Sequence, residues 1–290
     1  MIAPNNTTTA PTLREYALSY VSLRDGSPGY RRQLLWCVGF LEQWLGRELA
    51  ISQLSDVLIR DYVFAHRGRL APRTLRNRRN MLLRLLNHAC DDETLAVRPN
   101  PPRRSTRPAI RVAAANISTW TIGEVRHLLA TAESLTREYP GHMLASRYWS
   151  SWIRAAWDSG LRGCDLRSLE RHWINERGIL TIRQQKTGKN HYAAFRPSTL
   201  AAIDRLWNES RRFVWPLFCS LSEWRKEAAD LVKAAGLTGS IGMLRHSAGT
   251  AVELQHPGHG PLFLGNTPDV FYAHYFDRSR AVGQTMPEEL

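Results

Sequence analysis

Hydrophobic residues recur at helical spacing through the first third of the chain. Between residues 12 and 95, apolar positions fall three or four residues apart, which places them on one face of an α-helix. The apolar faces of four predicted helices contain Leu13, Ala17 and Tyr20; Leu34, Val38, Leu41 and Leu45; Ile59, Tyr62 and Val63; and Leu75, Leu82, Leu86 and Ala89. Ser55 is expected to cap the third helix and Pro72 to open the fourth. Residues 12–95 should form a small all-helical domain after a flexible arm, 1–11.

A second region follows a segment without periodicity. Residues 96–117 contain four prolines and five arginines, a composition typical of a linker. Thr121 and Glu124 then have the spacing of a capping box at the start of a helix. Further helices are predicted at 143–158, 198–212, 221–235 and 243–255. Period-two spacing across 178–195 predicts a β-hairpin. Residues 118–290 should therefore form an α+β domain, and the whole chain should be mainly α with a small β-sheet.

Composition excludes several classes of protein. The chain of 290 residues is 43% hydrophobic and contains 10 Trp, 9 Tyr and 8 Phe, enough for a sizeable core. No apolar stretch approaches the ~18–20 residues needed to cross a bilayer, and the polar N-terminus lacks the pattern of a signal peptide. The four cysteines form no C-x-x-C pair, so we expect reduced thiols in a cytoplasmic, nucleoid-associated protein with no membrane partner.

The charge balance points to a polyanionic partner. Lys and Arg together number 39 against 26 acidic residues, which gives a formal charge of +13. Only four of the basic residues are Lys, so arginine dominates. The planar guanidinium of arginine can donate two hydrogen bonds to phosphate oxygens, which favours nucleic acid as the partner. A GC-rich genome, which also favours arginine codons, is the alternative explanation.

The fourth predicted helix carries a cationic stripe opposite its apolar face. Its members, together with two arginines of the linker, are the candidate DNA-backbone contacts: Arg73, Arg76, Asn80, Arg84, Arg103 and Arg104. No acidic residue lies between positions 73 and 90, whereas a face that only confers solubility normally mixes both signs. Contact with DNA and an ordinary solvated face both remain open for this stripe.

Three short segments carry candidate chemistry. SGLRGCDLRSL, residues 159–169, places Arg162 at the start of a helix, with Asp165 spaced to hold its guanidinium. QQKTGKN places Lys186 at the tip of the hairpin. MLRHSAGT and LGNTPDVFYAHYFD supply Arg245 and Tyr275. Each feature alone is more typical of a surface ion pair, a solvated lysine or a packed aromatic ring.

Taken in order, these segments resemble the tyrosine recombinase family, which includes the phage integrases. The first box of that family, T/S-G-L-R-x-x-E/D-L-x-x-L, fits Ser159 to Leu169 throughout. The family's hairpin lysine matches Lys186, and its second box matches Leu244 to Ser247. The third box pairs an L-G-H/W motif with a nucleophilic tyrosine nine residues later, the spacing between Asn266 and Tyr275. The resemblance spans residues 12 to 277 and implies a helical core-binding domain and a catalytic domain.

The resemblance also implies a reaction. Tyr275 would attack a DNA phosphorus and form a 3′-phosphotyrosine bond, which stores the energy of the broken linkage. Arg162 and Arg245 would stabilise the charge of the transition state, and Lys186 would protonate the departing 5′-oxygen. Asn266 would complete the site. No metal, ATP or other cofactor is expected.

Two positions depart from the family pattern. Gly242 stands where the second box has its first histidine, and Asn266 replaces the usual His or Trp of the third box. Loss of a general acid–base group costs ~10²–10⁴ in rate, so we expect the chemistry to be retained at a reduced rate. His246 and His274 lie nearby in sequence and are candidates to substitute, although a histidine at 246 also suits packing.

Three functions fit these observations. The first is a site-specific DNA recombinase or integrase of a mobile element, which the resemblance implies would act as a homo-tetramer on two double-stranded DNA sites. The second, favoured by Gly242, is a DNA-binding accessory or regulatory protein with the recombinase fold and impaired catalysis. The third is a DNA-relaxing topoisomerase that shares the chemistry but acts as a monomer.

Overall fold

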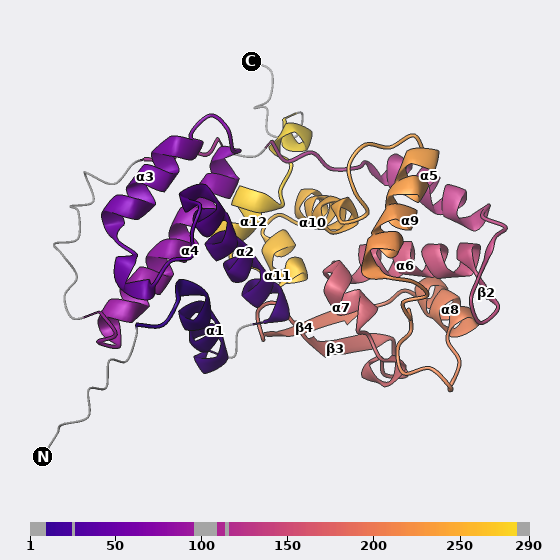
Figure 1. The fold of residues 1–290 in the computed structure, drawn as a ribbon. Coiled ribbons are helices and arrows are strands. Elements are labelled where there is room, and N and C mark those ends of the chain that lie inside the picture. Colours follow the sequence, from indigo (N-terminus) through magenta and orange to yellow (C-terminus); the bar gives the residue numbers. More distant parts are fainter. Residues whose placement is uncertain (1–9, 25–26, 96–108, 114–115, 283–290) are drawn as a thin grey trace, which may run out of the picture. The chain divides into compact units, whose positions relative to one another are not determined.

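The computed structural model describes residues 10–24, 27–95, 109–113 and 116–282, and the chain divides into two compact units, 1–113 and 114–290. Figure 1 shows that helices dominate the described part of both units. The expected arm lies almost wholly outside the described residues, as does most of the expected linker. The mainly α fold with a small β content is confirmed.

The first unit is helical throughout its described part. Its elements are α1 (Leu13–Leu23), α2 (Pro28–Leu45), the 3₁₀ turn η1 (Ile51–Gln53), α3 (Asp56–His66) and α4 (Pro72–Asp91). Ser55 caps α3 by accepting a hydrogen bond from the Leu58 amide, and Pro72 occupies the first turn of α4. Both predicted helix starts are confirmed. Ser55 accepts a hydrogen bond from one of the amides that the first turn of a helix leaves free, and a proline in the first turn has no amide hydrogen to leave unpaired.

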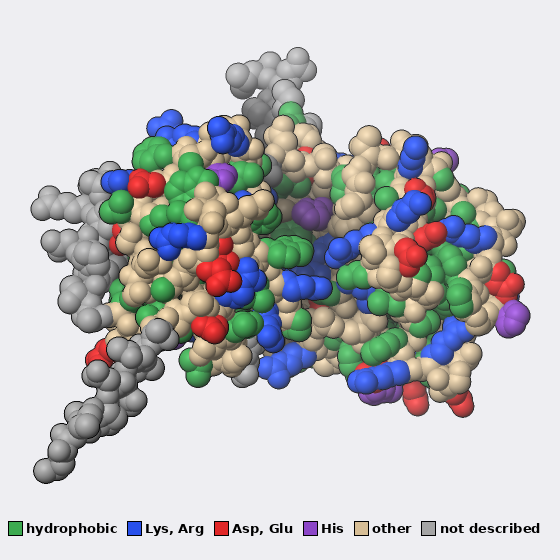
Figure 2. Space-filling model, viewed as in Figure 1, with side chains coloured by type: hydrophobic (Ala, Val, Ile, Leu, Met, Phe, Trp, Pro, Cys, Tyr) green, Lys and Arg blue, Asp and Glu red, His purple; other side chains and the backbone are tan. Residues whose placement is uncertain are grey.

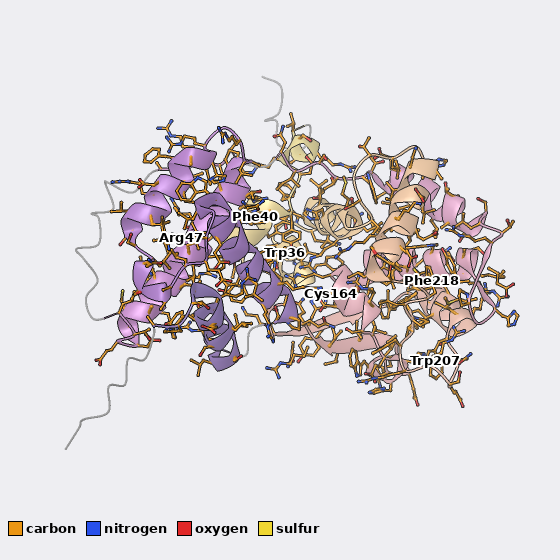
Figure 3. All side chains as sticks on the ribbon, in the orientation of Figure 1. Trp36, Phe40, Arg47, Cys164, Trp207 and Phe218 are labelled. Atoms are coloured by element: carbon orange, nitrogen blue, oxygen red, sulfur yellow. The ribbon has the colours of Figure 1, made fainter. Side chains whose placement is uncertain are left out.

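The predicted apolar faces form the core of the first unit. With the exception of the half-buried Leu45, all of the predicted apolar positions are buried, and α4 packs against α1, α2 and α3. Other aromatic side chains point outward: Trp36 and Phe40 on α2 are 65% and 42% exposed (Figure 3). The Arg78 guanidinium of α4 lies 3.8 Å from the Phe40 ring centroid, a cation–π contact. The surface of this unit therefore combines cationic and aromatic groups.

The second unit is built around a buried helix. Its elements are α5 (Ile122–Glu133), β1 (Glu138–Tyr139), β2 (Met143–Leu144), α6 (Ala145–Ser159), α7 (Gly163–Arg167), η3 (Arg171–Trp173), β3 (Ile179–Arg183), β4 (Asn190–Ala194), α8 (Pro197–Leu206), α9 (Leu221–Ala234), α10 (Met243–Gln255), α11 (His259–Leu264), α12 (Pro268–His274) and η4 (Arg278–Ala281). Helix α6 packs against α5, α7, α8, α10 and β4. It therefore links the elements that carry the candidate site.

Tryptophan side chains fill the core around α6. Trp149 and Trp152 are buried on α6, and their rings pack against Trp224 of α9. The indole N–H of Trp149 donates to the Tyr139 hydroxyl and that of Trp224 donates to the Tyr148 hydroxyl. Each of these buried donors thus has its partner, which holds α6 in one position.

The strands form two separate antiparallel hairpins. β3 pairs with β4 in a register that sets Ile182 opposite His191, and β1 pairs with β2. The β3–β4 hairpin was predicted, whereas β1 and β2 were not, because two residues per strand are too few for a periodic pattern. Among the residues that the structure describes, no helix is both long and apolar enough to cross a bilayer.

One predicted helix is shorter than expected. The 198–212 pattern gives α8 only as far as Leu206, and Trp207, labelled in Figure 3, follows its end. The Asn208 side-chain oxygen accepts hydrogen bonds from the Ser210 amide and hydroxyl. This local turn competes with helical hydrogen bonding, so the apolar spacing beyond 206 was misleading.

Candidate active site

The Ser159–Leu169 segment forms a sharp turn between α6 and α7. Gly160 ends α6 at φ +59°, and a β-carbon there would lie 2.6 Å from Leu264 and 2.7 Å from Phe263. Leu161 then turns into the core, and Arg162 is the N-cap residue of α7. Glycine is required at 160 both by the left-handed backbone and by the close approach of the chain around 264. The turn thus presents the Arg162 side chain beside the third predicted box.

Two side-chain amides hold the Arg162 guanidinium. Nη1 donates to Gln184 Oε1 at 2.6 Å, and Nη2 donates to Asn266 Oδ1 at 3.4 Å. These partners come from the lysine hairpin and from the loop between α11 and α12. Three segments distant in sequence therefore meet at Arg162.

Asp165 has a different role from the predicted one. It forms no ion pair with Arg162; its Oδ1 instead accepts a 2.9 Å hydrogen bond from the Gln185 amide. Because Arg162 precedes the first turn of α7 and extends toward Gln184, the i,i+3 helix-face argument does not apply to it. The predicted Arg162–Asp165 pair is wrong, and Asp165 anchors the loop that carries Lys186.

Arg245 is the most tightly held cation of the site. It lies in the first turn of α10 and is 5% exposed. Nη1 donates to the Gly160 carbonyl oxygen and Nη2 donates to the Leu264 carbonyl oxygen at 2.8 Å. Burial is the main cause that lowers the pKa of Arg245, yet a guanidinium stays protonated throughout the physiological range. The result is a fixed positive charge between the first and third boxes.

Tyr275 lies against this cation. The Arg245 Cζ atom is 5.0 Å from the centroid of the phenol ring, and the Tyr275 carbonyl accepts a hydrogen bond from the Thr250 hydroxyl on α10. Burial alone would raise the pKa of Tyr275, but the nearby guanidiniums of Arg245 and Arg162 lower it overall. A lower pKa makes the phenolate, the nucleophilic form, easier to reach.

The two arginines and the tyrosine line one pocket of about 210 Å³. Gly242 and His246 also line it. A larger pocket of about 530 Å³ lies elsewhere in the unit, lined by parts of α5, α6 and α10, but its lining contains no tyrosine or cysteine beside its arginines. Chemistry rather than size therefore identifies the smaller pocket as the candidate site.

In the described part of the chain, neither neighbouring histidine forms a hydrogen bond with the Tyr275 hydroxyl. The His246 ring packs over the Tyr275 ring at a centroid distance of 4.6 Å and a 30° angle. Burial, with Arg245 and His274 nearby, lowers the pKa of His246, which favours the neutral ring. His274 is exposed at the end of α12. The geometry of His246 is that of a packing partner for the tyrosine.

Gly242 leaves space at the edge of the pocket. Its backbone is right-handed helical, at φ −64° and ψ −19°, and a β-carbon there would meet only the Ser240 hydroxyl, at 3.5 Å. A side chain is therefore compatible with this position.

Lys186 lies apart from the pocket. It is exposed in the loop between β3 and β4 and makes no hydrogen bond or ion pair to the residues that the structure describes. The base of its loop is closed by hydrogen bonds from the Gln184 amide to the Lys189 carbonyl and from the Gly188 amide to the Gln184 carbonyl. Lys186 is thus on an anchored loop, with its ammonium group free in solvent.

Buried polar atoms without partners gather at this site. Within the described residues, they include Gln184 Nε2, Arg245 Nε, Asn266 Nδ2 and Asp165 Oδ2. An unsatisfied buried polar group costs about 1–3 kcal/mol, so such a cluster calls for an explanation. Three of the four atoms are hydrogen-bond donors: two belong to the amides that hold Arg162, and the third is part of the Arg245 guanidinium. This set fits an anion with several acceptor oxygens.

The sequence interpretation missed two residues of the site. Gln184 is 1% exposed and His191 is 3% exposed. His191 Nε2 donates to the Ser159 carbonyl oxygen at 2.9 Å, and burial lowers the pKa of this histidine. Strand periodicity could have indicated Gln184, because alternate residues of β3 share the buried face of Leu180 and Ile182.

The candidate DNA contacts of the first unit lie on α4. Arg73, Asn80 and Arg84 are exposed, and Arg76 is half-buried. The three arginines make no hydrogen bond or ion pair to other described residues, whereas the Asn80 oxygen accepts from Arg79. Figure 2 shows basic side chains spread over the surface of both units. The other two candidates, Arg103 and Arg104, lie outside the described residues.

No metal centre accompanies the site in the part of the chain that the structure describes. His, Cys, Asp and Glu side chains form no group of three or more there that could hold a metal ion. The described cations near Tyr275 are arginine side chains.

Sequence comparison gives no relatives: no family model matches the chain, and no curated protein matches it. Comparison with solved structures does find proteins of similar fold. A lambda integrase dimer bound to a COC′ core site has a TM-score of 0.68 at 16% identity, over 96% of this chain and 99% of that one. The Tn1549 transposon integrase with circular intermediate DNA gives 0.65 at 13% identity, over 96% and 100%. The XerH site-specific recombinase bound to a palindromic difH substrate gives 0.69 at 14%, over 92% and 82%. The chain therefore has the fold of the tyrosine recombinases.

Proposed function

We propose that the protein is a site-specific DNA recombinase or integrase of the tyrosine recombinase family, which cuts and rejoins DNA through a 3′-phosphotyrosine intermediate. The observation that carries this proposal is the Tyr275 phenol, which packs on a buried, immobilised Arg245 in a pocket shared with Arg162. A nucleophile beside two fixed cations suits attack on a phosphodiester, whose negative charge otherwise repels nucleophiles.

The reaction follows from these groups. The Tyr275 oxygen bonds to phosphorus, the bond from phosphorus to the 5′-oxygen breaks, and the phenol loses its proton to solvent. Arg162 and Arg245 bind the non-bridging oxygens, where charge grows in the transition state. A 5′-hydroxyl from a second strand then attacks the phosphotyrosine, which restores a phosphodiester and the free phenol. No ATP is consumed, because the covalent intermediate conserves the energy of the first bond.

Lys186 is proposed as the acid that protonates the departing 5′-oxygen. Its loop is anchored at Gln184 and, through Gln185, at Asp165, both of which adjoin Arg162 or its helix. The exposed tip can therefore approach bound DNA while its base stays fixed to the catalytic pocket. An alkoxide leaves poorly, so a positioned proton donor contributes ~10²–10⁴ in rate.

DNA binding is assigned to the cationic face of α4 and to the linker. On α4, the exposed Arg73 and Arg84 make no hydrogen bond or ion pair to other described residues, so they are free to contact phosphates and to release counterions. The solved lambda integrase tetramer bound to a Holliday junction, with a TM-score of 0.69 at 15% identity over 98% of this chain, supports a homo-tetramer on two duplexes. Cytoplasmic, nucleoid-associated localisation follows from this role.

An accessory DNA-binding protein with impaired catalysis is the second candidate. Gly242 favours it, because no imidazole is available there to bind the phosphate or to move the tyrosine proton. The retained Tyr275, Arg162 and Arg245 geometry favours the enzyme. A monomeric topoisomerase would need the same pocket but no sequence preference.

A trapped covalent intermediate separates these candidates. Binding sites are first selected from random duplex DNA with the full chain, and nicks are then placed across the selected sequence so that the short cleaved strand diffuses away. We expect a protein–DNA adduct that resists denaturation and is absent with Tyr275→Phe. Tight binding without adduct at any nick position would support the accessory role. Relaxation of supercoiled DNA that lacks the selected sequence, by a monomer, would support the topoisomerase.

A further inference from the structure

The two amides that hold Arg162 each keep one unused group. A guanidinium has donors only, so Gln184 and Asn266 must turn their oxygens toward it, which fixes the orientation of both amides. Gln184 Oε1 also accepts from the Thr187 hydroxyl at 2.9 Å. The nitrogens Nε2 and Nδ2 are left over, and both are buried without a partner among the described residues.

The Gln184 nitrogen lies close to the third box. A β-carbon on Gly265 would be 3.4 Å from Gln184 Nε2, so this donor borders the backbone that leads directly into Asn266. The side chain is 1% exposed, which excludes bulk water as its regular partner. Two neutral donors therefore belong to the amides that hold Arg162, and Arg245 Nε is a further buried donor without a partner among the described residues.

We propose that Gln184 is a catalytic residue that binds the scissile phosphate, with Nε2 donating a hydrogen bond to a non-bridging oxygen. This inference rests on the proposed function. A phosphate oxygen satisfies the buried donor, and the hydrogen bond strengthens as charge accumulates in the transition state. Gln184 thereby offsets part of what the missing imidazole at Gly242 would supply. The same side chain joins Arg162 to the hairpin that carries Lys186.

A phosphate ligand explains the cluster better than a neutral one. The unpaired donors belong to the two amides that bind Arg162 and to Arg245 itself, and the charges of both arginines favour an anion. The unpaired Asp165 Oδ2 is an acceptor and repels an anion, but Oδ1 of the same carboxylate is bound to the Gln185 amide. Donors and positive charge therefore outnumber the single opposing group.

Two substitutions separate phosphate binding from anchoring of Arg162. Gln184→Glu keeps oxygens for Arg162 and Thr187 but replaces the Nε2 donor with an anionic oxygen. Gln184→Met keeps the volume and removes both functions without adding charge. The readout is the rate of adduct formation on the nicked duplex at saturating protein, with the DNA Kd and the thermal midpoint measured for each variant. Thr187→Val is the matched control, because it removes the other donor to Oε1 and leaves Nε2 intact.

We expect adduct formation to fall by about 10²–10³-fold for Gln184→Glu and by at least about tenfold for Gln184→Met, with DNA affinity retained and Thr187→Val nearly unaffected. A Gln184→Glu variant at the wild-type rate would overturn the inference, since a carboxylate anchors Arg162 equally well. A Gln184→Met variant at the wild-type rate would also overturn it, because the hydrogen bond would then contribute nothing. If the wild-type chain itself forms no adduct, it is the proposed function that fails.

Discussion

The arginines of α4 and the arginines of the pocket carry the same charge in opposite settings. Arg73 and Arg84 are exposed, and no described residue accepts their hydrogen bonds. Arg245 is 5% exposed and donates to two backbone carbonyls. The first kind is exposed, screened by salt and suited to binding a long polyanion. The second is rigid and dehydrated, so its charge acts strongly at one point. Position in the fold therefore decides which arginines can act in catalysis.

The largest effect is expected from the buried cation. Arg245→Ala should reduce the rate of adduct formation by about 10²–10³-fold, because one fixed donor to the transition-state oxyanion is lost. DNA affinity should change little, since binding is spread over many phosphate contacts. Arg245→Lys is the control for charge. An ammonium keeps the charge but cannot reproduce the hydrogen bonds to both the Gly160 and Leu264 carbonyls, so the rate of adduct formation should stay low. If Arg245→Ala loses DNA binding and cleavage in parallel, the pocket arginines do not differ in role from the arginines of α4.

Arg245→Ala should also change the pH at which the unreacted Tyr275 phenol ionises. The guanidiniums of Arg245 and Arg162 hold the pKa of Tyr275 below its ordinary value. Removal of Arg245 should raise this pKa, so that the phenolate forms at higher pH and the basic rise of the cleavage rate moves upward. Ultraviolet difference titration gives the Tyr275 pKa in each background, from the wild type against Tyr275→Phe and from Arg245→Ala against Arg245→Ala/Tyr275→Phe, and the two values together give the shift. An unchanged or lowered pKa would exclude Arg245 as its cause.

A gain of activity is expected at Gly242. The right-handed backbone and the open β-carbon position accept a side chain, so Gly242→His should fold and place an imidazole at the pocket edge. Cleavage should speed up, by as much as about 10²-fold if the imidazole serves in acid–base catalysis. Gly242→Phe controls for bulk alone. An unchanged cleavage rate in a folded Gly242→His variant would indicate that the pocket has adapted to the absence of a histidine at this position.

Local signals in the sequence predicted much of the fold. Caps at Ser55 and Thr121 and the apolar spacing of α4 and α10 depend on residues within one or two turns, so they are readable without tertiary knowledge. The end of α8 was misplaced because the Asn208 turn overrides the apolar pattern. β1 and β2 were missed because two residues per strand are too few to show a periodic pattern.

The sequence indicated three residues of the pocket but not the contacts that hold them. The resemblance to the recombinase boxes indicated Arg162, Arg245 and Tyr275, and these three line one pocket. The partners of Arg162 come from residues 184 and 266, which no local rule connects to position 162. The helical rule chose Asp165 instead, because it presumed that Arg162 lies within the helix.

The role of the Gly160 turn, whose carbonyl accepts a hydrogen bond from Arg245, can be tested through the free energy of unfolding. Gly160→Ala places a β-carbon within 2.7 Å of Leu264 and Phe263, beside the carbonyl that binds Arg245. Overpacking of this kind typically costs about 1–3 kcal/mol, in addition to left-handed backbone strain. Gly236→Ala is the matched control in the same unit, with φ +65° and nothing within 4 Å of its β-carbon. Chemical denaturation should show the larger loss for Gly160→Ala; equal losses would attribute the effect to backbone strain alone.

The smallest effects are expected on α4, and they should depend on salt. Arg73→Ala and Arg84→Ala should each weaken DNA binding modestly and lower the slope of log K against log salt by about one, because one phosphate contact and its released counterion are lost. The cleavage rate at saturating protein should stay unchanged, unlike that of Arg245→Ala. Arg60→Ala is the control: Arg60 is also exposed in the first unit, but its Nε already pairs with Asp61 at 3.0 Å. If Arg60→Ala lowers the slope as much as Arg84→Ala, then net charge rather than the α4 face governs binding. If neither changes the slope, the cationic stripe is only a solvated surface, and the DNA contacts of the first unit must be sought elsewhere, first at the exposed aromatic residues of α2.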